Sequence, residues 1–304
     1  MSRFKILVFL LTLGIAGSII ATAYWYYMNV LGHDDALASE IKAIQGNKAS
    51  LPDPGIRRFN DAVELIAEGK LIEGRNALYA LVATFPDSNR ATEAKRIIGE
   101  INMDMMFSVE TNPQKKKYIV QTGDSVGLIA RKQETTIECL MRANGLFNHR
   151  LHPGDHLYVF PLDFEVVVDV SEKTVTLLRN YGEKKTLFKE YLAIDVRLPT
   201  YVRAPVELVI SSRAAWSAGK QVDSANPLFV SADKWLMGNR RGANGPGLNI
   251  RAVPQAKPVV PTADPKTADA AVADAIEPGV FLQREDVEEL YTIIRPGTAF
   301  KITR

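Results

Sequence analysis

The apolar positions of the chain begin as one unbroken run near its start. Residues 6–28 contain no charged residue. At a rise of 1.5 Å per residue, such a run spans roughly 30–35 Å as a helix, which is enough to cross a bilayer. Arg3 and Lys5 precede it, and this charge bias favours an extracytoplasmic remainder. The pattern therefore predicts a single-pass signal anchor at residues 1–28, in the cell (inner) membrane, with the bulk of the chain extracytoplasmic or periplasmic.

A cleaved signal peptide is the alternative for this run. Ala21-Thr22-Ala23 has the small-x-small form of a cleavage site. The apolar run continues past it to Met28, which favours an uncleaved anchor and leaves cleavage open. Residues 29–56 are polar and contain LPDPG, so we interpret them as a stalk.

Helical periodicity follows in residues 57–107. Apolar residues recur three or four positions apart, and Gly69 and Pro86 interrupt the pattern. The positions that resemble a tetratricopeptide-like unit are Ala62, Gly69, Ala77, Phe85 and Pro86. One and a half units are too few for a free-standing solenoid. This helical segment is therefore either a spacer or a docking groove for a cell-wall protein partner.

Residues 117–161 change to a strand, two helices and a strand. The first strand ends at Thr122-Gly123-Asp124, and a helix begins at Ser125. A second helix runs to Asn144-Gly145, and Pro153-Gly154-Asp155 turns the chain into the strand LYVF. Glycine stands where the backbone must turn sharply, so the order βααβ is predicted.

This segment resembles a LysM domain along its whole length. The matching motifs are Y-x-V-x-x-GDS, Ile129-Ala130, Asn144-Gly145-Leu146 and L-x-PGD-x-L. The resemblance implies binding of GlcNAc-containing glycan, peptidoglycan above all, in a shallow groove between two loops. The glycan-binding positions that it implies are Gly123, Asp124, Ser125, Val126, Asn144, Gly145, Leu146 and Phe147. Several of these residues would be required by the turns alone, so a purely structural role is the alternative for each.

Strand periodicity dominates residues 163–304. Apolar and polar residues alternate in FEVVVDVSEKTVTLLRN, and Asn180-Tyr181-Gly182 predicts a turn. Near the end, Val287, Leu290, Tyr291 and Ile294 predict one face of a helix that stops at Pro296-Gly297 before a last strand. The fold class expected for the chain is therefore α+β multidomain, with a single transmembrane helix, the tetratricopeptide-like helices, the βααβ domain and a mostly-β domain.

The mostly-β segment resembles the L,D-transpeptidase (YkuD-type) domain, which cross-links peptidoglycan stem peptides through a cysteine. Its opening strands, the Ala204-Pro205 turn, Trp216 and the ending G-V-F…E-D-V-E-E-L-Y…PGT-x-x-x-I carry the resemblance. The nucleophile position that it implies, directly after Gly279, is Val280, and the position of the histidine base is Arg251. The arginine expected after the nucleophile is absent or replaced by Leu282.

Residues 163–304 contain neither cysteine nor histidine. A valine side chain has no ionisable atom, so cysteine-type transpeptidation is chemically excluded at this position. We therefore predict no catalytic residue and a domain used for binding or scaffolding. The alternatives are an L,D-transpeptidase with unrecognised chemistry, acting in peptidoglycan cross-linking or remodelling, and an adaptor that docks proteins through the helical segment.

Composition adds a few exclusions. The net charge is +2, with 24% charged residues, which gives no reason to expect nucleic acid as a partner. Cys139 is the only cysteine, so an internal disulfide and a multi-cysteine zinc site are excluded, and no metal or cofactor is expected. Its expected role is that of a small buried apolar residue. Residues 254–278 are rich in Pro, Ala and Asp and are expected to form a mobile insertion.

Overall fold

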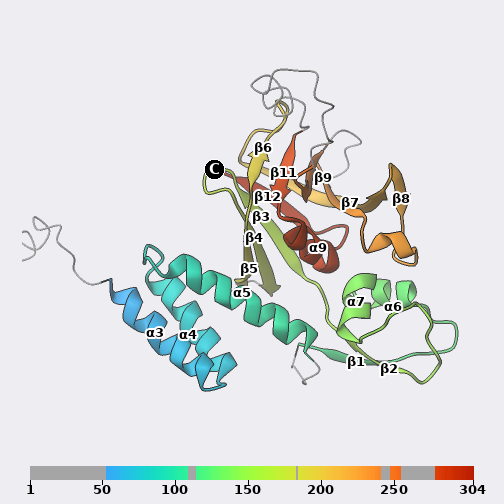
Figure 1. Ribbon diagram of the computed structural model, residues 1–304, viewed down its shortest axis with the longest axis horizontal. Helices are drawn as coiled ribbons and strands as arrows, with labels where there is room; N and C mark the ends of the chain where they lie inside the picture. The colour runs from blue at the N-terminus through green and yellow to red at the C-terminus, as the bar shows by residue number, and fades with distance from the viewer. Residues whose placement is uncertain (1–52, 109–113, 183, 241–246, 255–277) are drawn as a thin grey trace, which may run out of the picture. The chain divides into compact units, whose positions relative to one another are not determined.

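The computed structural model describes residues 53–108, 114–182, 184–240, 247–254 and 278–304. The chain divides into two compact units, Met1–Ile56 and Arg57–Arg304. Apart from the first turn of α3, all of the elements below lie in the second unit (Figure 1).

The predicted membrane span requires a correction. No helix among the described residues is long and apolar enough to cross a bilayer. The run at residues 6–28 that gave rise to the prediction lies outside the described residues, as does nearly all of the stalk. The expected transmembrane helix and the membrane localisation that rests on it are therefore wrong. The remainder of the expected class agrees in part with the mixed α/β structure, which includes a mostly-β domain.

Three helices occupy the stretch from residue 53 to residue 108. They are α3 (Pro54–Ala67), α4 (Leu71–Thr84) and α5 (Ala91–Phe107). Gly69 allows the turn between α3 and α4 because its φ is +82°, a conformation that side chains disfavour. Their small core consists of Phe59, Ala62, Leu78, Leu81, Ala94 and Ile98.

The next segment folds as β1 (Lys116–Ile119), α6 (Val126–Lys132), α7 (Ile137–Ala143) and β2 (His156–Val159). The two strands are antiparallel, with Lys116 opposite Val159. Ser125 and Thr136 cap the two helices, and their side chains accept hydrogen bonds from the amides of Leu128 and Cys139.

The C-terminal segment forms a ten-stranded sheet from the described residues. Its strands are β3 (Phe164–Asp169), β4 (Thr174–Tyr181), β5 (Lys184–Leu192), β6 (Asp195–Arg197), β7 (Val206–Ser217), β8 (Lys220–Val222), β9 (Asp233–Asn239), β10 (Leu248–Ala252), β11 (Gly279–Leu282) and β12 (Ala299–Thr303). Nine strands follow the order β5-β4-β3-β12-β7-β9-β10-β11-β6, and β8 pairs with β7. A 3-10 turn η2 (Pro227–Phe229) precedes β9, and α9 (Arg284–Ile293) joins β11 to β12. Residues 255–277, which make up most of the predicted insertion, lie outside the described residues.

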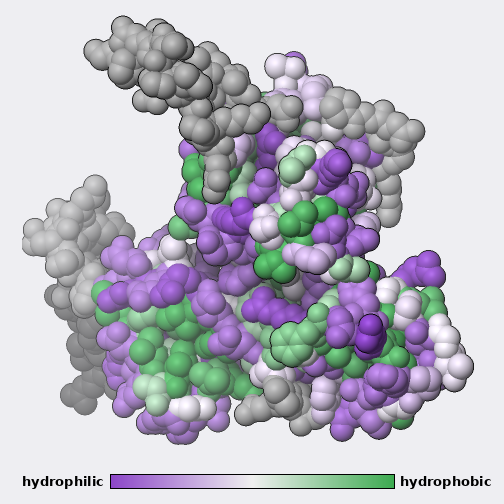
Figure 2. All heavy atoms as spheres, turned by 45° about the vertical axis from the view of Figure 1, so that its right-hand side comes forward, coloured by the Kyte–Doolittle hydropathy of each residue, from purple (hydrophilic) through white to green (hydrophobic). Residues whose placement is uncertain are grey.

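One hydrophobic core connects the three segments. It includes Met106 of α5, Cys139 of α7 and Leu162 of the connection before β3, together with the inward side chains of the sheet. In contrast, some large apolar side chains are exposed, and Phe147 is the most exposed of them at 98%. Figure 2 shows hydrophobic residues reaching the surface as separate patches between hydrophilic ones on the face that it presents.

The helical segment packs along β5, the strand at one end of the sheet order. Tyr79 Oη donates to Leu187 O at 2.6 Å, and Asn102 Nδ2 donates to Phe188 O at 2.7 Å. These side chains supply hydrogen-bond donors to two carbonyls of this end strand. Lys189 of the same strand pairs with Glu100 of α5 at 3.0 Å and with Glu289 of α9 at 2.6 Å.

Candidate functional site

The first loop of the candidate glycan groove is stabilised by hydrogen bonds to the side chain of Asp124. Asp124 accepts hydrogen bonds from Tyr118 Oη at 2.6 Å and from the Gln121 amide at 3.0 Å, and Lys132 Nζ lies at 3.1 Å. The bond from Tyr118 is the main reason that the pKa of Asp124 is lowered. The carboxylate of Asp124 is thus engaged in hydrogen bonds that hold this loop.

The second loop is held by an asparagine. Asn144 Nδ2 donates to Leu140 O and to Tyr158 O, each at 2.8 Å, and its Oδ1 accepts from the Tyr158 amide at 2.7 Å. Gly145 follows with a φ of +60°. The amide of Asn144 therefore ties the end of α7 to β2, and its side chain has a structural use.

The other predicted groove residues divide by burial. Val126 is 1% exposed and belongs to the core of the βααβ domain, and Leu146 packs against that core. Ser125 caps α6. Phe147, in contrast, offers almost its whole ring to solvent. Among the predicted side chains, Phe147 is thus the one with a free apolar surface for a sugar ring.

The structure places the two implied catalytic positions on neighbouring strands but on opposite faces. Ile250 lies opposite Val280, and Arg251 lies opposite Phe281, in the parallel pair β10–β11. Val280 is fully buried in the common core. Successive side chains of a strand alternate between faces, so Arg251 points to the other side, where it meets Phe281. Val280 and Arg251 therefore cannot act on one substrate atom.

On its own face, Arg251 lies between two aromatic rings. Its guanidinium carbon is 4.6 Å from the ring centroid of Trp235 and 5.4 Å from that of Phe281. Gly279 shares this face by alternation, and a Cβ there would lie 3.1 Å from Asn249 O and 3.3 Å from the Phe281 ring. This face thus carries a packed arginine but neither a thiol nor an imidazole.

A small cavity of about 240 Å³ opens beside Arg251. Its lining residues are Asp233, Trp235, Arg251, Ala252, Val253, Pro254 and Arg284. Arg284 Nη1 donates to Asp233 Oδ1 at 3.4 Å. The described lining combines two guanidinium groups with one carboxylate, which suits the binding of an acidic group better than proton transfer.

Comparison with known proteins distinguishes the two candidate sites. A family model described as LysM domain matches residues 118–160. The chain contains a LysM domain. The LysM domain predicted from the turn motifs is thereby confirmed. A LysM domain is a module of the peptidoglycan-binding type.

Among curated proteins, the chain is 52% identical over 42 residues to the N-acetylmuramoyl-L-alanine amidase sle1 of two Staphylococcus aureus strains, USA300 and NCTC 8325. The match covers 14% of this chain and 13% of each relative, so it concerns one domain.

Solved structures that resemble the chain include Bd1075 of Bdellovibrio bacteriovorus and two L,D-transpeptidases. Bd1075 has a TM-score of 0.30 at 15% identity, and the match covers 46% of this chain and 47% of that chain. A mutant L,D-transpeptidase of Enterococcus faecium has a TM-score of 0.26 at 13% identity, with 46% and 49% covered. The enzyme of Stackebrandtia nassauensis has a TM-score of 0.28 at 13% identity, with 47% and 56% covered. These values describe a partial resemblance.

The LysM domain is attached to the sheet by contacts that the sequence pattern did not predict. Glu138 of α7 accepts from Arg213 Nη2 of β7 at 2.8 Å, and the same nitrogen donates to Tyr291 O at 2.6 Å. Thr136 Oγ1 donates to Thr292 O. These partners lie 75 to 156 positions apart in the chain, so local periodicity carries no sign of them.

Cys139 lies inside this attachment and has no reactive character. It is 1% exposed, and burial raises the pKa of its thiol to about 11. A thiol with this pKa is protonated at neutral pH and is a poor nucleophile. The expected structural role of Cys139 agrees with this environment.

Proposed function

We propose that this chain binds GlcNAc-containing peptidoglycan glycan through its LysM groove, and that the L,D-transpeptidase-like domain is non-catalytic and used for binding or scaffolding. The observation that supports glycan binding is the difference between the groove side chains that stabilise its loops and the one that is exposed to solvent. Asp124 and Asn144 are engaged in holding its loops, whereas Phe147 is 98% exposed. Fixed loops lower the entropy lost on binding, and an exposed ring offers apolar surface to a sugar.

Replacing Phe147 by alanine is expected to weaken binding to purified sacculi roughly fivefold, because the partial burial of an aromatic ring contributes about 1 kcal/mol. The thermal unfolding midpoint should stay unchanged, since an exposed ring makes few contacts within the protein. A co-sedimentation titration of the purified chain measures the affinity.

The matched control is Tyr201→Ala, because Tyr201 is 50% exposed in the C-terminal domain. It should bind sacculi as the wild type does. Equal affinity of all three proteins would remove Phe147 from the proposed groove, and a wild-type protein that stays in the supernatant would refute glycan binding altogether.

The second part of the proposal is supported by where the implied catalytic positions point. Val280 lies in the core, and Arg251 is held between Trp235 and Phe281. Residues 163–304 supply neither Cys nor His. An acyl-transfer site needs a nucleophile and a base within hydrogen-bond reach of each other. An arginine between aromatic rings instead suits the binding of a carboxylate.

Introducing a thiol at the implied nucleophile position is expected to leave it inert. In Val280→Cys the new side chain would face the core, so a maleimide should label the native protein no faster than it labels the wild type, whose one cysteine is buried. Muropeptides incubated with either protein should show no new cross-links by mass spectrometry.

Ala67→Cys is the positive control, because Ala67 is exposed at the end of α3. Its thiol should react at the rate of a free thiol. If Val280→Cys labels as fast as Ala67→Cys, position 280 does not face the core, and if the wild type forms cross-links, the non-catalytic assignment fails.

A further inference from the structure

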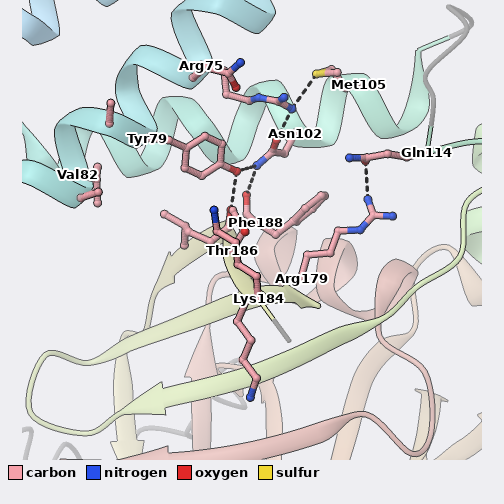
Figure 3. A pocket seen from close by; sticks show the side chains of 15 residues that line it. Arg75, Tyr79, Val82, Asn102, Met105, Gln114, Arg179, Lys184, Thr186 and Phe188 are labelled. Atoms are coloured by element: carbon pink, nitrogen blue, oxygen red, sulfur yellow. Dashed lines mark hydrogen bonds between the residues drawn. The ribbon is translucent and has the colours of Figure 1, made fainter. Parts of the chain in front are cut away.

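A second and larger cavity lies between the helical segment and the sheet, away from both sites described above. It has a volume of about 630 Å³, and α4, α5, β4 and β5 supply its walls. Figure 3 shows Tyr79 of α4 and Asn102 of α5 pointing toward the strand residues Thr186 and Phe188, and Arg75 pointing toward Asn102 and Met105. The volume lies within the range of small-molecule sites.

The charged side chains among the described lining residues are all basic. They are Arg75, Arg179, Lys184 and Lys185, and the described part of the lining contains no acid. Lys185 pairs with Glu165 outside the lining set, and Figure 3 shows the Lys184 amine turned away from the helices. Arg179 donates to Gln114 Oε1 at 2.6 Å and lies 4.0 Å from the Phe160 ring centroid. Arg75 is the remaining cation of the described lining.

Arg75 is half-buried, and its partners among the described residues are all neutral. Its Nη1 donates to Asn102 Oδ1 at 3.0 Å and to Met105 Sδ at 3.1 Å, and its guanidinium lies 5.9 Å from the Tyr79 ring. Its Nε is buried and has no acceptor. Within the described part of the chain, no carboxylate comes within 4.0 Å of this guanidinium.

A half-buried guanidinium that has no carboxylate partner among the described residues raises the free energy of the folded protein. Removing a charge from water costs free energy unless an opposite charge or hydrogen-bond acceptors replace the water. A carboxylate or phosphate could supply both, because its oxygens match the planar fork of arginine. The site is thus incomplete in a way that an anion would correct.

The rest of the cavity wall is apolar. Alanine and valine of α4 face leucine and phenylalanine of β5, and the apolar lining residues are Ala80, Val82, Ala83, Leu187 and Phe188. A free inorganic anion would leave this wall bare. An anion joined to an apolar body would cover it and gain from its burial.

We propose that this cavity binds a small organic anion, a carboxylate or a phosphate on an apolar body, with Arg75 as its anchor. This inference does not depend on glycan binding by the LysM domain, because the cavity is built from other residues. Its chemistry also differs from that of the groove, where the exposed Phe147 ring is the proposed contact.

Isothermal titration of the full chain with four eight-carbon probes tests the proposal. Octanoate and octyl phosphate represent the two anion sources, and octanol and octylammonium are the neutral and cationic counterparts. We expect at least one of the anions to bind at about 1 mM or below, and the neutral and cationic probes to bind at least tenfold more weakly. Binding of neither anion, or equal binding of octanol or octylammonium, would overturn the proposal.

Three variants locate the binding. Arg75→Met keeps the apolar stem and removes the charge, and it should weaken anion binding at least tenfold. Arg57→Met, at an exposed arginine of α3, should have no effect. Ala80→Trp fills the cavity from an exposed position of α4 and should abolish binding even if Arg75→Met does not fold. Wild-type affinity in a folded Arg75→Met or Ala80→Trp protein contradicts the assignment. Sacculus binding should be unaffected by all three.

Discussion

Replacing Phe300 by alanine is expected to lower the free energy of unfolding by about 3–5 kcal/mol. Phe300 is fully buried in β12, which pairs with β3 on one side and with β7 on the other. Truncation removes a large apolar side chain and leaves a cavity that the two neighbouring strands cannot close. Urea unfolding followed by tryptophan fluorescence measures the change.

The partner of Phe300 provides an internal check. A Cβ at Gly238 would lie 2.3 Å from Phe300 Cδ1, so the ring occupies the space that the glycine leaves. Gly238→Ala should therefore destabilise the wild type and be better tolerated beside Phe300→Ala. Phe147→Ala is the matched control and should change stability by less than about 0.5 kcal/mol. If Phe300→Ala lowers the free energy of unfolding by as little as the control does, Phe300 is not packed in the core as described.

Replacing Arg213 by alanine is expected to lower stability by about 3 kcal/mol. Arg213 and Glu138 are 12% and 15% exposed, and removing the arginine leaves a largely buried carboxylate and the Tyr291 carbonyl without their donor. The stacking of Arg213 over the Tyr291 ring, at 4.0 Å, is lost as well. Hydrogen exchange of the α7 amides should become faster, because this pair attaches α7 to the sheet.

The comparison for Arg213 is Arg90→Ala, which breaks a largely exposed pair with Glu93. A loss of about 0–1 kcal/mol is expected there. The loss of unfolding free energy in the double variant Arg213→Ala/Glu138→Ala should be smaller than the sum of the losses in the two single variants. Each single variant leaves the charge of the other residue without its partner. Equal losses for Arg213→Ala and Arg90→Ala would exclude the attachment as a major source of stability.

The LysM domain could be predicted from sequence because its determinants are local. Gly123, Gly145 and Gly154 stand at turns with positive φ, and Ser125 and Thr136 cap helices next to them. Such signals span a few residues and need no distant partner. The expected membrane helix came from a local signal too, yet the described structure contains no helix of that kind.

Which side chains of β11 point into the core could not be predicted from local signals. All four residues of the strand are buried, so no alternation marks its two faces. The register against β10 and β6 decides which side chains point into the core. The sequence comparison placed Val280 at a reactive position, whereas pairing places it in the core and leaves Arg251 on the other face. The contacts of Arg75 with α5 could not be predicted from local patterns either, because they join residues that lie 27 and 30 positions apart in the chain.

Leu162 links the LysM domain to the sheet, and both of its backbone groups are engaged. Its amide donates to Glu134 O at 2.9 Å, and its carbonyl accepts from Arg295 Nε at 3.0 Å. A tension applied to the LysM domain is therefore carried into the sheet through these bonds, and in parallel through the contact of α7 with α9. If a wall polymer pulls on the groove, these bonds share the load with the covalent chain at Leu162.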